Sequence, residues 1–287
     1  MYVLCCPCVL SPSLRAKGIT KSSDLELFRK TIERCKKFNI EIVPLPCPET
    51  LFLGPDRKPG TFLERLDLAE FFVFLDELTK KVNIIVENRG PPLCIIGVNS
   101  SPTCGVTSTY YGADGDKPPK REGRGVFLSG FPKIVAEDVG SFGRYCVYFA
   151  APLFSNAERS YNASVAEILR NNLFEVYLPQ ECGDDSGTRE ANHQEHLFLK
   201  NKQALDACDI VVAVIDGADA DSGTAWEMGY AFAKGKPVIA LRTDFRKAGN
   251  HEQVNLMLER SATAVVAGTE QLLEVMKSPF PRIGINN

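Results

Sequence analysis

Two carboxylates in the second half of the chain, Asp221 and Glu227, stand where an apolar run gives way to a loop and a helix. A carboxylate such as Glu227, inside an otherwise apolar helix, must be paired, hydrogen-bonded or functional, because unpaired burial of charge is costly. The simpler alternative is an acid near a helix amino terminus, where it favours the helix dipole.

The elements around these acids form a strand–loop–helix–strand unit. Ile210–Ile215 is a β-branched run typical of a buried parallel strand, and Asp216–Gly223 is a loop of small and acidic residues. Thr224 can cap the helix that follows, Gly235 ends it, and Pro237–Leu241 predicts the next strand. In doubly wound sheets, ligands bind outside the carboxyl ends of the strands, which is where both acids lie.

Three cysteines could do a different chemistry in the first half, which holds most of the 10 cysteines in the chain. Each follows a candidate strand: Cys8 follows Tyr2–Leu4, Cys47 follows Ile40–Pro44, and Cys104 follows Leu93–Val98. Because such ends converge on one edge of a parallel sheet, three thiolates there could bind a soft metal or three irons of a four-iron cluster. Alternatively, these cysteines are small buried hydrophobes.

Composition limits the class of protein. With 287 residues, 44% hydrophobic and 24% charged, the chain is typical of a globular protein with room for two domains. A net charge of −3 argues against a general nucleic-acid partner. No apolar run is long enough for a membrane span, so no membrane partner is expected. The short, cysteine-rich start does not read as a signal peptide, and we expect a cytoplasmic location.

Strands and helices alternate along the whole chain, which favours an α/β fold. Helices are predicted at Asp24–Phe38, Thr61–Lys80, Ser155–Arg170 and Glu195–Ala207, and further strands at Arg144–Ala150 and Phe174–Pro179. Lys133–Arg144 reads as a linker. We therefore predict two Rossmann-like or flavodoxin-like three-layer domains with mostly parallel sheets, at residues 1–140 and 141–287. The segment after Ala150 lacks the glycines of a dinucleotide fingerprint, so NAD binding is not expected.

The second half resembles the nucleoside 2-deoxyribosyltransferase family in three motifs. These are Asp221-Ser-Gly-Thr-Ala-Trp-Glu227-Met-Gly-Tyr-Ala, Tyr148-Phe-Ala-Ala-Pro-Leu-Phe-Ser155 followed by Glu158, and Asn255-Leu-Met257. The resemblance implies a salvage enzyme that needs no cofactor and acts on nucleosides and free nucleobases. It also implies a homo-oligomer in which a neighbouring subunit completes each site.

Residue roles follow from the same resemblance. Glu227 would be the nucleophile of a retaining, covalent transfer of 2-deoxyribose, Tyr148 would orient it, and Asp221 would hold the sugar hydroxyls. The expected substrate-binding residues are Pro152, Phe154, Asn201, Gly223, Asn255 and Met257. Tyr148 and Phe154 could frame a flat base, or belong to the core.

One of these positions departs from the family. The family often has aspartate where this chain has Asn201, which weakens any general-acid role there. An amide can instead hydrogen-bond the base, because it both donates and accepts.

Two other functions compete for the second half. An N-glycoside hydrolase of deoxynucleosides, nucleosides or their 5′-monophosphates would use the same fold with water as acceptor. A nucleotide-binding module without chemistry is the other class, although both acids are present.

The first half, over about residues 1–130, is similar to a small cysteine-rich family that includes thiouracil desulfidases. The matching motifs are Cys8-Val-Leu, Cys47-Pro-Glu49, Ser101-Pro-Thr-Cys104-Gly and Gly123-Arg-Gly125. The resemblance implies a 4Fe-4S cluster on Cys8, Cys47 and Cys104, with Glu49 and Ser101 as acid/base groups near the open iron. Leu14 stands where that family has another cysteine. In this alternative the first half is the enzyme and acts on thiolated bases.

Overall fold

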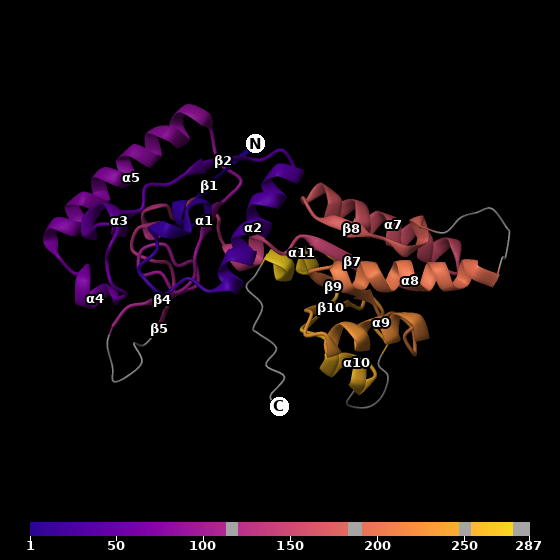
Figure 1. The fold of residues 1–287 in the computed structure, drawn as a ribbon. Helices are drawn as coiled ribbons and strands as arrows, with labels where there is room; N and C mark the ends of the chain where they lie inside the picture. The colour runs from indigo at the N-terminus through magenta and orange to yellow at the C-terminus, as the bar shows by residue number, and fades with distance from the viewer. Residues whose placement is uncertain (113–119, 183–190, 247–253, 278–287) are drawn as a thin grey trace. The chain divides into compact units, whose positions relative to one another are not determined.

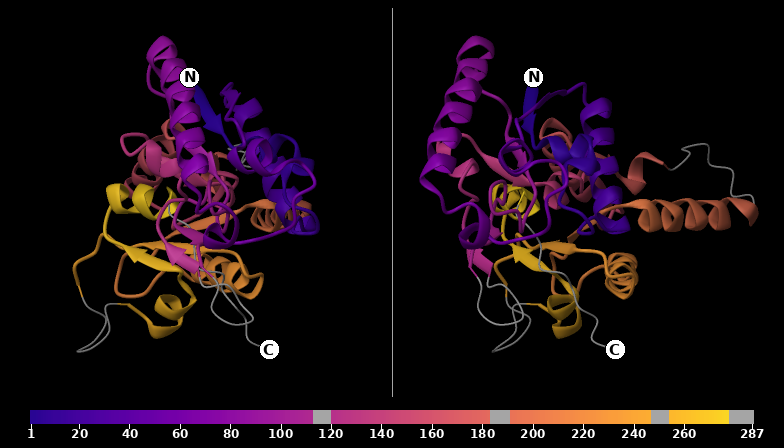
Figure 2. Two further views of the ribbon diagram at one scale, coloured as in Figure 1. Left: turned by 90° about the vertical axis from the view of Figure 1, so that its left-hand side faces the viewer. Right: turned by 60° about the vertical axis from the view of Figure 1, so that its left-hand side comes forward.

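The computed structural model describes residues 1–112, 120–182, 191–246 and 254–277, with only the backbone at 191–192. The chain divides into two compact units, Met1–Gly143 and Arg144–Asn287, called here the amino-terminal and carboxy-terminal units (Figures 1 and 2). Both are α/β units built on parallel sheets, as predicted. None of the helices in the described ranges is long and apolar enough to cross a membrane.

The amino-terminal unit is built on a four-stranded parallel sheet of order β2-β1-β3-β6. Its strands are β1 (Tyr2–Cys5), β2 (Glu41–Pro44), β3 (Ile95–Gly97) and β6 (Ala136–Asp138), and a separate antiparallel pair joins β4 (Ser108–Tyr110) to β5 (Lys120–Glu122). The helices are α1 (Pro7–Leu10), α2 (Ser22–Lys37), α3 (Pro48–Leu53), α4 (Phe62–Arg65), α5 (Ala69–Arg89) and α6 (Val139–Phe142). Figure 1 shows α2 and α5 on opposite sides of β1.

The carboxy-terminal unit has a five-stranded parallel sheet of order β11-β10-β9-β7-β8. Its strands are β7 (Cys146–Ala150), β8 (Glu175–Tyr177), β9 (Ile210–Val214), β10 (Val238–Leu241) and β11 (Ala264–Val266). Its helices are α7 (Asn156–Asn171), α8 (Ala191–Ala207), α9 (Ser222–Ala233), α10 (Leu256–Ser261) and α11 (Thr269–Lys277). Counted from β7, this is the flavodoxin-like order, whose switch point lies between β7 and β9.

Helices cover both faces of this second sheet. Helices α8 and α9 contact each other and β7, whereas α7 and α11 contact each other on β8 and β10, which makes three layers. All five residues of β9 are buried, as its unbroken apolar sequence requires in a sheet covered on both faces. The amino-terminal part of α8 extends away from the strands in the right-hand view of Figure 2, while its other end packs beside α9.

Two expectations about the elements are wrong. Lys133–Arg144 is not a linker, because β6 and α6 within it pair with β3 and pack on α2. The helix expected at Thr61–Lys80 is two helices, because Leu68 adopts an extended conformation before α5 begins.

Candidate functional site

Glu227 lies on α9 beside the sheet of the carboxy-terminal unit. Its neighbours on the helix, Thr224 and Met228, are buried, so the carboxylate lies at the edge of the core. The phenol of Tyr148, a fully buried residue of β7, donates a hydrogen bond to Glu227 Oε1. Burial raises the pKa of Glu227 to about 7, the Tyr148 hydrogen bond opposes that rise, and the charge of Asp221 adds to it.

A partly buried carboxylate whose pKa is raised, such as that of Glu227, destabilises the fold when it is ionised. The folded pKa of about 7 exceeds the ordinary glutamate value of 4.5, so the cost is absent near pH 4 and complete above pH 7. We expect Glu227→Gln to raise the free energy of unfolding by about 2 kcal/mol at pH 8 and by much less at pH 5. Denaturant titrations at the two pH values check this, and an equal effect at both would contradict it.

Asp221 caps α9. Its Oδ2 accepts hydrogen bonds from the backbone N–H of Thr224 at 3.0 Å and from the Thr224 hydroxyl at 3.4 Å. The expected cap, Thr224, is instead a buried residue of the first turn. The cap fixes Asp221 close enough to Glu227 for its charge to affect the pKa of that carboxyl.

A cavity of about 310 Å³ opens beside Glu227. Helices α8 and α9 and strand β7 line it through Tyr148, Phe198, Asn201, Lys202, Leu205, Gly223, Trp226 and Glu227. The rings of Phe198 and Trp226 lie 5.9 Å apart and are about half exposed, at 51% and 49%. The cavity therefore joins a partly buried carboxylate to an open aromatic rim, and flat apolar rings suit a flat ligand.

Beneath this cavity, aromatic and amide groups from three elements are linked. Tyr148 of β7 and Tyr177 of β8 are paired in register, and their rings stack at 5.5 Å with an interplanar angle of 17°. The Tyr177 hydroxyl donates to Asn201 Oδ1 at 2.8 Å. This network supports both Glu227 and Asn201 from the sheet side.

The structure brings some of the expected binding residues together and leaves others elsewhere. Asn201 and Gly223 line the cavity beside Glu227, whereas Pro152, Phe154, Asn255 and Met257 are not among its lining residues. Phe154 is 81% exposed, and Met257, just after the α10 cap Asn255, is 75% exposed.

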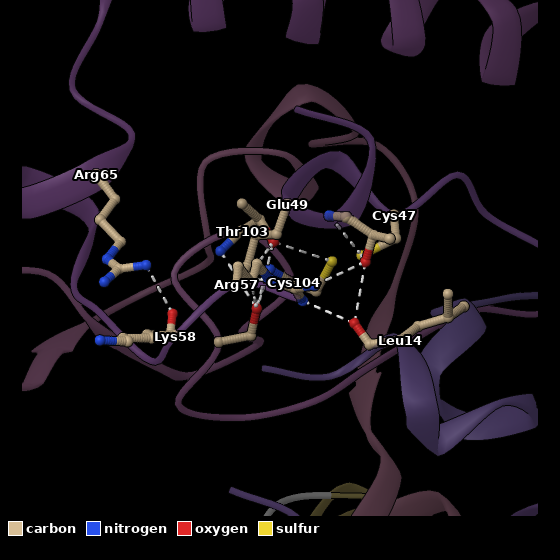
Figure 3. A network of polar contacts seen from close by, with 10 residues as sticks. Leu14, Cys47, Glu49, Arg57, Lys58, Arg65, Thr103 and Cys104 are labelled. Carbon is tan, nitrogen blue, oxygen red and sulfur yellow. Dashed lines mark hydrogen bonds and ion pairs between the residues drawn. The ribbon is translucent and has the colours of Figure 1, made fainter. Parts of the chain in front are cut away.

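A second polar cluster lies in the amino-terminal unit (Figure 3). Glu49 Oε1 accepts hydrogen bonds from the hydroxyls of Ser101 at 3.0 Å and Thr103 at 2.8 Å. Arg57, which is buried, approaches Glu49 Oε2 with its Nε at 3.4 Å. The two residues expected to act together, Glu49 and Ser101, are thus in direct contact.

The same cluster reaches Cys47. The Thr50 hydroxyl lies 3.1 Å from the Cys47 sulfur, and Arg57 donates to that hydroxyl at 2.9 Å and to the Leu14 carbonyl at 2.8 Å. Leu14 thus contributes its backbone carbonyl to this network. Arg57 and Thr103 were missed from the sequence, although Thr103 lies inside the Ser101–Cys104 motif.

The three candidate metal ligands lie near one another. Burial, followed by the charges of Cys104 and Cys47, raises the pKa of the Cys8 thiol, and burial is also the main cause of the raised pKa of Cys47. In the part of the chain that the structure describes, no group of three His, Cys, Asp or Glu side chains has an arrangement that could hold a metal ion. The donor set has the soft chemistry that iron or zinc requires, but its side-chain positions do not form a coordination sphere.

The carboxy-terminal unit thus places a partly buried carboxylate beside a cavity with an aromatic rim. A family model described as nucleoside 2-deoxyribosyltransferase matches residues 147–263, which lie within this unit. The match supports a glycosyl-transferring enzyme that acts on nucleosides. No curated protein matches the chain. No comparison supports the resemblance of the amino-terminal unit to desulfidases.

Several solved structures are similar to about half of the chain. A conserved protein from Enterococcus faecalis V583 is 36% identical and covers 46% of this chain and 96% of its own, with a TM-score of 0.39. A 2-deoxyribosyltransferase from Bacillus psychrosaccharolyticus is 22% identical over 47% of this chain and 98% of its own, with a TM-score of 0.39. A CMP N-glycosidase from Clostridium botulinum is 19% identical over 45% and 95%, with a TM-score of 0.29.

Proposed function

We propose that the carboxy-terminal unit transfers 2-deoxyribose between nucleobases, with Glu227 as the nucleophile. The observation that carries the proposal is the partly buried Glu227 carboxylate, which accepts a hydrogen bond from Tyr148 and opens on a cavity with an aromatic rim. A carboxylate suffices as nucleophile because a sugar without a 2′-hydroxyl loses its base readily. The transition state is oxocarbenium-like, as it is in retaining glycosidases.

The reaction would proceed in two displacements. Glu227 attacks C1′ of a 2′-deoxynucleoside, the bond from C1′ to the base nitrogen breaks, and the base leaves with the electron pair. A second base then attacks C1′ through its ring nitrogen, loses a proton to solvent and releases Glu227. Two inversions give net retention at C1′. The Tyr148 hydroxyl fixes the orientation of the attacking carboxylate.

The other side chains would hold the substrate. Asp221 caps α9 through Oδ2, so its other carboxylate oxygen can accept a hydrogen bond from a hydroxyl of the sugar. Phe198 and Trp226 would contact the base at the rim of the cavity. Met257 is 75% exposed and lies outside the cavity, which suits the proposal that Asn255 and Met257 serve a neighbouring subunit in a homo-oligomer.

Chromatography of deoxyinosine with and without free adenine tests this function. Deoxyadenosine that forms only when adenine is present establishes transfer. Hypoxanthine and free deoxyribose that form regardless of adenine would identify a hydrolase. Failure to convert deoxyinosine or other deoxynucleosides under either condition would contradict both activities.

The rate should depend on the ionisation of Glu227. Because the nucleophile must be charged and its pKa is raised to about 7, kcat/KM should rise with pH through that region. The Tyr148 hydrogen bond lowers the Glu227 pKa, so Tyr148→Phe should move the rise to higher pH by roughly one unit and lower the plateau. Tyr161→Phe, on α7 and outside the cavity lining, is the matched control. An unmoved profile in Tyr148→Phe would contradict the orienting role.

We also propose a second function, in which the amino-terminal unit holds a 4Fe-4S cluster on Cys8, Cys47 and Cys104. The contact between Glu49 and Ser101 beside Cys47 and Cys104 favours it, because acid/base groups and thiols share one site. The thiols have to move into coordinating positions, since their present arrangement is not that of a metal site.

A further inference from the structure

Three aromatic rings from α8 and α9 are in contact with one another at the rim of the cavity. The indole of Trp226 stacks on the ring of Tyr230, with the ring centroids 5.2 Å apart and an interplanar angle of 14°. The ring of Phe198 lies 5.9 Å from the same indole at an angle of 59°. Trp226 and Phe198 line the cavity, whereas Tyr230 is not among its lining residues. Tyr230 therefore supports the indole without lining the cavity itself, and Trp226, which is 49% exposed, still offers surface to a ligand.

Charged groups hold Tyr230 in place at both its hydroxyl and its ring. The hydroxyl donates to Asp206 Oδ1 at 2.7 Å, and Asp206 Oδ2 accepts from Lys202 Nζ at 2.8 Å. These hydrogen bonds lower the pKa of Asp206, so this acceptor stays ionised. The amines of Lys202 and Lys234 lie 5.3 and 5.4 Å from the centre of the Tyr230 ring, within the range of cation–π attraction. A phenol held in this way has little freedom to turn, so the indole stacked on it keeps one orientation.

We propose that Tyr230 positions Trp226 as a preformed stacking surface, and that this surface makes the cavity selective for purine bases. The inference rests on the proposed deoxyribosyl transfer, since it names the class of base that the same cavity takes. Every base has a flat face that can stack on an aromatic side chain, and the strength of stacking sets the preference among bases. The two fused rings of a purine can cover the two fused rings of an indole, whereas the single ring of a pyrimidine covers only part of them.

A fixed orientation of the indole is what turns stacking into selectivity. A ring that is already held in its binding orientation loses little conformational freedom when a base stacks on it, so more of the stacking energy appears as affinity. A freely turning indole would lose part of that energy on ordering. Removing the support of Tyr230 should therefore weaken the binding of purines most, because purines gain most from the stack.

Fluorescence titration tests the stacking surface, because Trp226 is the single tryptophan of the chain. The measurement uses Glu227→Gln, which lacks the proposed nucleophile, so that binding is separated from turnover. Deoxyadenosine should quench the emission with a Kd about tenfold below that of thymidine. Equal Kd values for the two nucleosides overturn the selectivity for purines. Binding of deoxyadenosine, measured by calorimetry, that leaves the emission unchanged overturns the contact with Trp226.

Two substitutions at Tyr230 test the positioning role. Tyr230→Leu removes the stacked ring, and kcat/KM should fall about tenfold for deoxyinosine but less than about threefold for thymidine. Tyr230→Phe keeps the ring and loses only the hydrogen bond to Asp206, so it should retain most of the purine preference.

The matched control is Phe232→Leu, which removes a partly exposed ring of α9 outside the cavity lining and should leave both donors unaffected. Equal losses for both donors in Tyr230→Leu overturn the positioning role, since a general disturbance of the fold acts on both alike. If the wild-type protein converts neither donor, the proposed function itself fails. That outcome is distinct, because the titration still decides whether Trp226 selects purines.

Discussion

Replacing Glu227 with alanine is expected to abolish base exchange while leaving the fold intact. The variant has no group that can attack C1′, so kcat should fall by roughly three to six orders of magnitude, as for other nucleophile variants. Burial raises the pKa of Glu227 to about 7, which means that the charged carboxylate destabilises the fold. Removing this carboxylate should therefore not unfold the variant. Exchange between deoxyinosine and adenine, followed by chromatography, measures the loss.

Two further variants distinguish the loss of the nucleophile from a general disturbance of the protein. Glu227→Gln keeps the size of the side chain and its ability to accept the Tyr148 hydrogen bond, and it should be as inactive as the alanine variant. Glu167→Gln, on the exposed face of α7, should exchange bases at the wild-type rate. Wild-type exchange by either Glu227 variant would rule out covalent catalysis by this residue.

The second large effect is expected in the amino-terminal unit. Protein purified without oxygen should be brown and contain about four irons per chain, and replacing Cys8, Cys47 and Cys104 with serine should remove both the colour and the iron. Serine lacks the soft thiolate that iron–sulfur clusters require, and losing three ligands leaves none of the proposed anchors. Iron analysis and visible absorbance are the measurements.

A matched control for this experiment lies in the same unit. Cys35 of α2 is buried and lies outside the proposed set of ligands, and burial raises the pKa of its thiol to about 11. Cys35→Ala should therefore keep the full iron content. Colourless, iron-free wild-type protein after anaerobic preparation and reconstitution with iron and sulfide would show that the three thiols are core residues too.

The sequence was most informative where patterns are local. The β-branched run at Ile210–Ile215 predicted β9, and the alternation of strands with helices predicted two α/β units with parallel sheets. The prediction of a linker at Lys133–Arg144 was wrong because β6 is only three residues long. Two of those residues are acidic, so the sequence gives no sign that the strand pairs with β3.

The candidate site depends on contacts between distant positions, which local patterns do not contain. Tyr148 and Glu227 are 79 positions apart, and their hydrogen bond requires β7 to lie under α9. Tyr177 sits in a strand of three residues and reads as a core position until its register with Tyr148 is known. Arg57 was equally hidden, because its three partners come from the chain at Leu14, Glu49 and Thr50.

The most direct measurement is the mass of the protein after reaction with a 2′-deoxy-2′-fluoroarabinosyl nucleoside, in which the fluorine slows release of the sugar. The account predicts a gain of one fluorinated deoxyribosyl group per chain, located by peptide mapping on Glu227 and absent from Glu227→Gln. An unmodified protein that nevertheless turns over deoxynucleosides, or an adduct on another residue, would contradict it.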